Sequence, residues 1–383
     1  MIYLDNNATT AVDPLVREAM LPYLGEAYGN PSSMHRFGQE SRQAVEQARH
    51  QVAGLLGCDV RELLFTSCGT ESNNAAIHGV LAIRSPRMTI ITSSVEHSSV
   101  REPLQALVKS GYRVIEIPVD LRGHLDMAAL DTALGDPDLA LVSIMWANNE
   151  TGVVFDVAAI GGKCRAAGVP LHVDAVQAAG KLSMAVRDLP VDLLSVSGHK
   201  FHGPKGVGAL YMRRGVRWQP WLRGGPQERD RRGGTENVAG IVGLGKAAEL
   251  AREALADDRS WQRVAILRDR LESELIAKIS DAHVNGDPNH RLVNTTNIGF
   301  AGLEAEAILL LLSERDVCAS AGAACSSGSL APSHVLRAMR LPERVAHGAI
   351  RFSLSRRTTD ADIDGALAIV PGVIDRLRAT LPV

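Results

Sequence analysis

The chain has 383 residues, of which 45% are hydrophobic and 22% are charged, and its formal net charge at pH 7 is −2. This length and composition exclude a disordered chain and predict one large domain with a smaller companion. The balanced charge gives no footprint for nucleic acid, and no apolar run is long enough to cross a bilayer. The sequence begins Met-Ile-Tyr-Leu-Asp-Asn without an export-signal pattern, so we expect a cytoplasmic protein.

Cysteine usage argues against structural cross-links. The five cysteines are scattered along the sequence, at Cys58, Cys68, Cys164, Cys318 and Cys325. Their odd number and the lack of a Cys-x-x-Cys pair disfavour a disulfide framework or a closed zinc site. We therefore expect no metal in the isolated protein, and we expect any special cysteine to be reactive. Cys318 lies in an apolar context and is predicted to be buried.

Short apolar runs alternate with amphipathic stretches between residues 62 and 212. The predicted strands are 63–65, 89–92, 113–117, 139–145, 171–174, 193–196 and 208–212, and the predicted helices are 70–83, 98–110 and 157–167. Strands that alternate with helices predict an α/β domain with a mainly parallel sheet. In such sheets, ligands bind beyond the carboxyl ends of the strands.

Beyond about residue 256 the pattern changes. It predicts a long charged helix over 261–279, a strand over 297–300, a helix over 304–313 and a closing helix from 360. A second, smaller α+β domain is the simplest interpretation. Residues 254–260 fit either a linker or a junction between two helices.

Polar clusters follow several of the predicted strands and are expected to converge on one cleft. They lie at 66–70, 96–97, 148–152, 174–177 and 197–200. The last cluster places Lys200 at a strand end. A lysine so placed either anchors an anion or, when its pKa is lowered, forms a Schiff base with a carbonyl.

Three further clusters carry residues with both a functional and an ordinary interpretation. The helix start at Gly69 and Thr70 is suited to bind a phosphate, unless Thr70 is an ordinary N-cap. His97 is suited to stack on a flat ring and move protons, although a single histidine is more often a surface or core residue. Asp174 either caps the next helix or keeps a pyridine nitrogen protonated.

The last two candidates lie in the carboxyl-terminal third. Small residues surround Cys325, which predicts an exposed, mobile loop over about 318–332 whose thiol can travel between two sites. Arg351 lies on a short predicted strand. It is either a surface ion-pair residue or a fork that grips a substrate carboxylate.

Taken together, these residues resemble the cysteine desulfurases of the class V aminotransferase family, within the fold-type I enzymes that use pyridoxal 5′-phosphate (PLP). The motifs that carry the resemblance are at 3–10, 29–33, 66–72, 148–152, 197–200 and 325–330, and it extends to residue 355. It is closest to the nitrogen-fixation type at 146–150 and in the cysteine loop. It implies a seven-stranded, mainly parallel sheet in a large domain (14–256) and a small α+β domain (1–13 and 257–383).

The resemblance also implies roles, position by position. Lys200 would form the Schiff base with PLP, His97 would be the ring-stacking acid/base, and Cys325 would accept sulfur. The other implied PLP contacts are Asp174 at the ring nitrogen, Gln177 at the phenolic oxygen, Gly69, Thr70, Ser197 and His199 at the phosphate, Asn149, and Thr235 of the partner subunit in a homodimer. Arg351, assisted by Asn149 and Asn30, would bind the substrate carboxylate.

The implied activity converts L-cysteine to L-alanine and leaves a persulfide on Cys325. The sulfur would go to an iron–sulfur scaffold or another acceptor protein, and Cys325 would be able to ligate a cluster transiently with such a scaffold. Two other hypotheses stand beside this one. The first is a selenocysteine lyase or aminotransferase of the same superfamily, and the second is a catalytically silent binding or scaffold protein that kept the fold.

Overall fold

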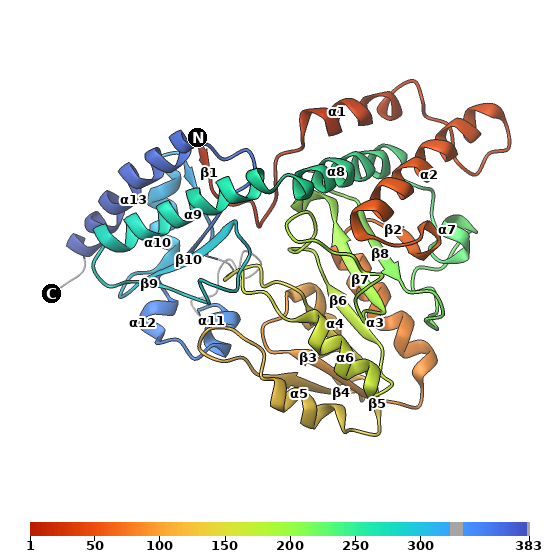
Figure 1. Ribbon diagram of the computed structural model, residues 1–383, viewed down its shortest axis with the longest axis horizontal. Coiled ribbons are helices and arrows are strands. Elements are labelled where there is room, and N and C mark those ends of the chain that lie inside the picture. Colours follow the sequence, from red (N-terminus) through yellow and green to blue (C-terminus); the bar gives the residue numbers. More distant parts are fainter. Residues whose placement is uncertain (322–331, 381–383) are drawn as a thin grey trace.

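The computed structural model describes residues 1–321 and 332–380. Its main layer is a seven-stranded sheet with the strand order β2-β8-β7-β6-β5-β3-β4 (Figure 1). The strands are β2 (Leu63–Thr66), β3 (Thr89–Ser93), β4 (Arg113–Ile117), β5 (Leu139–Met145), β6 (Leu171–Asp174), β7 (Leu193–Ser197) and β8 (Gly208–Met212). β8 runs antiparallel to β2 and β7, and the other neighbours are parallel. The predicted α/β class and mainly parallel sheet are confirmed.

Helices cover both faces of this sheet, which is why β5 is buried at every position. On β2, Leu63 and Phe65 belong to one apolar cluster and Leu64 belongs to the other. The first cluster includes α2 (Arg36–Leu56), α5 (Met127–Leu134), α6 (Val157–Ala166) and α8 (Val238–Ala256), and the second includes α3 (Gly69–Arg84) and α4 (Ser98–Lys109). Because helices pack on both faces, the position of the sheet edge is fixed. The carboxyl ends of β3, β5, β6 and β7 lie at this edge.

A third apolar cluster lies at the other end of the molecule, away from the large sheet (Figure 1). It is built on an antiparallel sheet, β12-β10-β9, and a parallel pair, β1 and β11. Its elements are β1 (Ile2–Tyr3), α9 (Asp258–Lys278), β9 (Ala282–Val284), β10 (Thr295–Phe300), α10 (Ala305–Ser313), β11 (Val317–Cys318), β12 (Ala349–Ser353) and α13 (Asp360–Thr380). Both ends of the chain therefore contribute to this smaller part, which has its own apolar core.

Two details differ from or refine the sequence-based expectations. Cys318 is only half-buried, because β11 is a two-residue strand paired with β1; Cys164, 1% exposed, is a buried thiol. Residues 254–260 form a helix junction, since α8 ends at Ala256 and Asp257 accepts a hydrogen bond from the Arg259 backbone at the start of α9.

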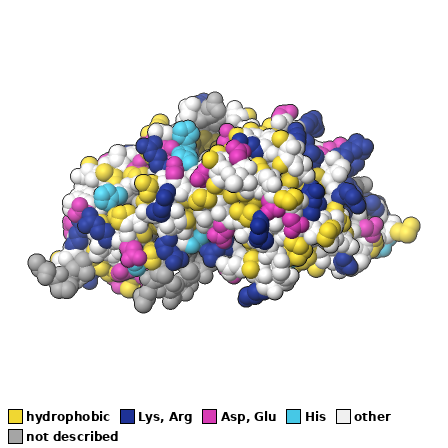
Figure 2. Space-filling view, turned by 90° about the horizontal axis from the view of Figure 1, so that it is seen from below, with side chains coloured by type: hydrophobic (Ala, Val, Ile, Leu, Met, Phe, Trp, Pro, Cys, Tyr) yellow, Lys and Arg dark blue, Asp and Glu magenta, His cyan; other side chains and the backbone are white. Residues whose placement is uncertain are grey.

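The remaining short elements connect these layers. They are α1 (Pro14–Met20), η1 (Leu21–Leu24), η2 (Val60–Glu62), η3 (Gly198–Lys200), α7 (Gln227–Asp230), α11 (His334–Ala338) and α12 (Glu343–Ala346). On the face drawn in Figure 2, basic and acidic side chains are interspersed rather than gathered by sign. Among the described residues, no helix has both the length and the apolar character needed to cross a membrane.

Candidate active site

A pocket of about 410 Å³ opens where the parallel strands of the large sheet end. Ten of the residues expected from the sequence line it: Gly69, Thr70, His97, Asn149, Asp174, Gln177, Ser197, His199, Lys200 and Arg351. Nine of these residues lie at or after the ends of strands β2, β3, β5, β6 and β7, and Arg351 lies on β12. The expected convergence on one cleft is therefore confirmed.

Lys200 contacts the amino-terminal segment of the chain. It ends η3, the single helical turn that follows β7. Its Nζ donates to the carbonyl oxygens of Asn7 at 2.7 Å and Ala8 at 2.9 Å. The half-buried amine is thus oriented by two backbone acceptors 193 and 192 positions away.

Asp174 is held by two donors at the end of β6. Its carboxylate accepts from Asn73 Nδ2 at 2.8 Å and from the Val176 backbone N–H at 2.9 Å. The side chain is 7% exposed. These two hydrogen bonds fix the orientation of the carboxylate in the pocket wall.

His97 is linked to Asp174 through two intermediate side chains. Asn73 Nδ2 also donates to the Ser99 hydroxyl at 2.9 Å, and that hydroxyl lies 2.8 Å from His97 Nδ1. Because Nδ1 also accepts the Ser99 backbone N–H at 3.1 Å, the ring proton is on Nε2. Burial lowers the pKa of His97, and the charge of Lys200 lowers it further against the opposing effect of Asp174. The ring is therefore neutral at pH 7.

Gln177 is oriented by a buried lysine. Lys181 Nζ donates to Gln177 Oε1 at 2.9 Å and to its carbonyl oxygen at 3.1 Å. Gln177 Nε2 in turn donates to the Asn7 carbonyl oxygen at 2.9 Å. Burial lowers the pKa of Lys181 to about 7, with the charges of Lys200 and Arg351 adding to the effect. The amide orientation is thus set, with its NH₂ group directed to the amino-terminal segment.

The start of α3 has the features of an anion site. Its N-cap residue is Cys68, which makes no side-chain capping bond, so Thr70 is not the cap. The first backbone N–H groups of a helix have no partner within it. Ser197 Oγ is buried without a hydrogen-bond partner, and a Cβ atom on Gly69 would come within 2.7 Å of Val176. His199 also lines this pocket, with its pKa lowered to about 4 by burial and by nearby lysines.

Arg351 lies on β12 and lines the same pocket as Lys200. It is 2% exposed, and its guanidinium donates to Asp5 Oδ1 at 2.5 Å and to the Asn149 carbonyl oxygen at 2.9 Å. Its Nε is buried without a hydrogen-bond partner. The pocket therefore contains a fixed guanidinium whose only carboxylate partner among the described residues is Asp5.

Cys325 lies outside the described residues, but both flanks of its segment lie beside the pocket. The Ser320 backbone pairs with that of Arg351, at 2.7 and 3.3 Å. On the other side, Ser333 donates to the buried Glu150 at 2.5 Å, and His334 lines the pocket. Burial raises the pKa of Glu150 to about 7.

Two expected residues do not line the pocket of this chain. Asn30 is exposed, and its side chain accepts the Ser32 backbone N–H at 2.9 Å. Thr235 is exposed in the loop after α7. Neither residue is among those that line the pocket.

Sequence reasoning missed four residues that orient the site: Asp5, Asn7, Asn73 and Lys181. Lys181 carried a weak signal, because it follows Gln177 by four positions, as contacting helical residues do. Asp5 and Asn7 gave no signal beyond belonging to a matched motif, because their contacts span most of the chain.

The chain matches known proteins along nearly its whole length. The family model described as aminotransferase class-V matches residues 2–365. "Cysteine desulfurase 2" of Trichormus variabilis is 56% identical over 382 residues, which cover 100% of this chain and 95% of that protein. "Cysteine desulfurase NifS" of Azotobacter vinelandii is 49% identical and is covered to 94% of its length by 100% of this chain.

Solved structures agree with these relatives. A structure titled "NIFS-LIKE PROTEIN" superposes with a TM-score of 0.91 at 39% identity, covering 98% of this chain and 100% of that one. A NifS-like protein from Rickettsia africae gives a TM-score of 0.88 at 32% identity, with coverage of 98% and 99%. The chain therefore belongs to the aminotransferase class-V family and, within it, to the NifS-type cysteine desulfurases.

Proposed function

We propose that this chain removes sulfur from L-cysteine with PLP held in the Lys200 pocket and with Cys325 as the sulfur acceptor. The observation that carries the proposal is the convergence of the Lys200 amine, the Asp174 carboxylate and the start of α3 in one pocket. A reactive amine, a fixed anion and an anion site are the three features that an aldehyde-bearing pyridine phosphate requires.

The residues at the start of α3 fit the phosphate of PLP. Ser197 has a buried hydroxyl without a partner, and helix N–H groups favour anions. The missing side chain at Gly69 leaves room that a Cβ would fill, since that atom would come within 2.7 Å of Val176. Thr70 and His199 would complete the phosphate contacts.

At the ring end, Asp174 would hold the pyridine nitrogen and Gln177 the phenolic oxygen. PLP, when bound, supplies an aldehyde that joins amines and a ring that withdraws electrons from the α-carbon of an amino acid. The hydrogen bonds from Asn73 and Val176 fix the orientation of the Asp174 carboxylate. A charged carboxylate favours the protonated ring nitrogen.

Two side chains of the pocket would move protons. Lys200 would hold the cofactor in the resting enzyme and act as a base once the substrate amine has taken its place. His97 would stack on the ring, with its Nε2–H available and its Nδ1 held by Ser99. Its neutral state suits proton exchange near pH 7.

Arg351 would bind the α-carboxylate of the substrate. Its guanidinium is a planar fork suited to a carboxylate, and it is fixed by Asp5 and by the Asn149 carbonyl group. A substrate carboxylate would compete with Asp5 for this fork. Asn149 would assist, and we propose that Asn30 joins only when a partner subunit is present.

The sulfur step needs a thiol and no external oxidant. The Cys325 thiolate attacks the substrate sulfur, so that an S–S bond forms and the Cβ–S bond breaks with its electron pair left on carbon. The carbon skeleton takes up protons and leaves as L-alanine, while Cys325 keeps the persulfide. Cys325 follows Ser320 by five residues, a length of chain that spans at most about 18 Å. Because Ser320 pairs with Arg351, this length supports the assignment.

We further propose a homodimer and a protein that accepts the sulfur. The chain exposes apolar side chains at Leu24, Tyr28 and Met34, which are 69%, 79% and 94% exposed. Such a patch is typical of an interface, and Thr235 would reach the partner's phosphate site. The acceptor would be an iron–sulfur scaffold or another sulfur carrier. A monomeric mass in solution light scattering would contradict the dimer.

The test of the activity compares two cysteine variants in the purified PLP-loaded protein. Wild type and Cys318→Ser are expected to form alanine and sulfide from L-cysteine in equal amounts when a thiol reductant is present. Cys325→Ser should keep the yellow colour and lose sulfide formation. If Cys325→Ser kept full activity with cysteine, the acceptor role would be wrong. Transfer of the amino group to a 2-oxo acid instead would identify an aminotransferase.

A further inference from the structure

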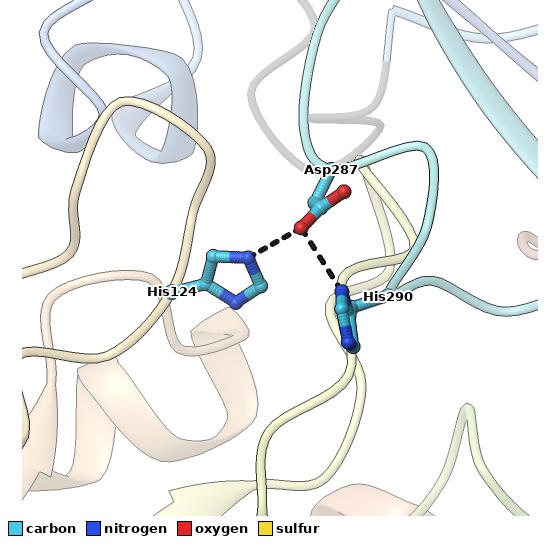
Figure 3. Close-up of side chains that lie close together, drawn as sticks. All are labelled: His124, Asp287 and His290. Carbon is cyan, nitrogen blue, oxygen red and sulfur yellow. Dashed lines mark hydrogen bonds and ion pairs between the residues drawn. The ribbon is translucent and has the colours of Figure 1, made fainter.

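Three side chains with metal-binding atoms meet away from the candidate active site. His124 Nε2 lies 2.7 Å from Asp287 Oδ2, and His290 Nδ1 lies 3.2 Å from the same oxygen (Figure 3). The two imidazole rings are 5.8 Å apart and nearly perpendicular, at 78°. The ligand atoms of these three residues all lie within 4.8 Å of one another. Among the described residues, this is the one group of three or more histidine, cysteine or acidic side chains that is so close.

The backbone fixes each of these three residues. His124 sits in the turn between β4 and α5, where its N–H donates to Asp120 Oδ1 at 2.9 Å. Asp287 Oδ1 accepts the Asn289 N–H at 2.8 Å, which turns Oδ2 toward the two rings. The carbonyl oxygen of His290 accepts the Val154 N–H at 3.0 Å. The donor atoms are thus positioned before any ligand arrives.

The donor set has the chemistry of a transition-metal site. Two imidazole nitrogens and one carboxylate oxygen suit Zn²⁺ and related divalent ions, whereas Mg²⁺ and Ca²⁺ prefer oxygen ligands. Tetrahedral zinc with bonds of about 2.0–2.1 Å places its ligands about 3.3 Å apart. The separation of 2.7 Å between His124 Nε2 and Asp287 Oδ2 needs to widen by about half an ångström to reach that spacing. The separation of 3.2 Å between His290 Nδ1 and Asp287 Oδ2 already matches it.

Exposure leaves room for a further ligand. Asp287 is 4% exposed, but the side chains of His124 and His290 are 35% and 72% exposed. Solvent can therefore reach the open side of the group and supply a water as the fourth ligand. Cysteine spacing does not reveal a site made of histidine and aspartate from two segments that are distant in the sequence, so this group was not predicted.

We propose that His124, Asp287 and His290 bind one divalent transition-metal ion, with zinc the best match. The ion joins the turn that carries His124 to the 285–292 segment that carries the other two ligands. That segment pairs with the 148–154 turn through Val154 and through the Leu292 N–H, which donates to the Gly152 carbonyl oxygen at 2.8 Å. The role of the metal ion is to stabilise the contact between the His124 turn and the 285–292 segment. The ion takes no part in the chemistry at Lys200.

Zinc binding to four matched proteins tests the proposal. All four carry Cys325→Ser, so that this thiol does not compete for zinc. They are the otherwise unchanged chain, His124→Asn, His290→Asn and the control His283→Asn, an exposed histidine on β9 outside the group. Each protein is stripped of metal and dialysed against buffer with a fixed concentration of free zinc. The bound zinc is then measured by inductively coupled plasma mass spectrometry.

The unchanged chain and His283→Asn should bind one zinc more per chain than the other two proteins. At this site, loss of a ligand should weaken affinity at least about 10-fold. Zinc should also raise the melting temperature of the unchanged chain more than that of His290→Asn, because a ligand stabilises the state that binds it. Equal stoichiometry, affinity and melting shifts in all four proteins would overturn the proposal and leave the group as a hydrogen-bonded contact only.

Discussion

Asn73 donates a hydrogen bond of 2.8 Å to the Asp174 carboxylate, joining helix α3 to the end of strand β6. Both side chains are buried, and the same Asn73 nitrogen contacts Ser99, which holds His97. One amide therefore positions two of the side chains that we assign to the cofactor ring, Asp174 and His97.

This relationship predicts graded losses of activity. Asp174→Asn should lower kcat/KM for L-cysteine about 100-fold, since it removes a fixed charge from the transition state. Asn73→Ala should lower it about 10-fold, the value of one hydrogen bond to a charged group, and should alter the visible absorbance of the bound cofactor. Asn74→Ala is the matched control, because Asn74 Nδ2 donates to the Thr70 carbonyl oxygen within the same helix. Equal activity in Asn73→Ala and Asn74→Ala would contradict the positioning role.

Arg351 provides a prediction about substrate affinity. Arg351→Lys keeps the charge but loses the fork, so it should raise the KM for L-cysteine about 10-fold or more with a smaller change in kcat. Substrate titrations on the PLP-loaded protein measure the split between the two constants. A change confined to kcat would show that Arg351 does not hold the carboxylate.

The loop that carries Thr235 is anchored by a buried ion pair, which predicts an effect on stability. Glu228 bonds both terminal nitrogens of Arg49, at 2.7 and 2.8 Å, and accepts the Phe65 N–H at 2.8 Å. Glu228→Gln should lower the free energy of unfolding by about 3 kcal/mol, because it leaves a buried guanidinium without its counter-charge. Glu46→Gln removes a half-exposed partner of the same arginine and should cost less than about 1 kcal/mol. Urea unfolding distinguishes them, and equal losses would contradict the account.

Glu96 predicts a pH dependence of stability. Burial raises its pKa from 4.5 to about 8, and the charge of Asp174 adds to this. Between these two values the folded state holds a proton that the unfolded state has lost, so the free energy of unfolding falls as pH rises. Glu96→Gln removes that proton uptake. Across this window, its free energy of unfolding should therefore rise relative to that of the wild type by up to about 1.4 kcal/mol per pH unit. Parallel stability curves for the two proteins would refute the shift.

The strand pattern of the large sheet could be predicted because it rests on local signals. Apolar runs such as 139–145 are buried on both faces, and the polar residues that follow them necessarily meet at one edge. This is why Asp174, Ser197 and Lys200 were found from the sequence. The resemblance to a known family then supplied their roles, which local patterns do not contain.

Long-range contacts could not be predicted in this way. The backbone acceptors for Lys200 lie at Asn7 and Ala8, and Arg351 pairs with Asp5, all at the other end of the chain. No periodicity links such positions, because only the packing of the small sheet against the large one brings them together. The roles of all the site residues, Cys325, Asn30 and Thr235 included, and the domain boundaries at 13/14 and 256/257 stay predictions.

Borohydride reduction of the PLP-loaded protein, followed by mass spectrometry of its peptides, tests the central claim most directly. The account predicts one phosphopyridoxyl group per chain, on the peptide that contains Lys200, and none in Lys200→Ala. Lys181 is the sharpest competitor, because it is buried close by with a pKa of about 7. A phosphopyridoxyl group on Lys181 or on another lysine in the wild-type protein, or none at all, would contradict the account.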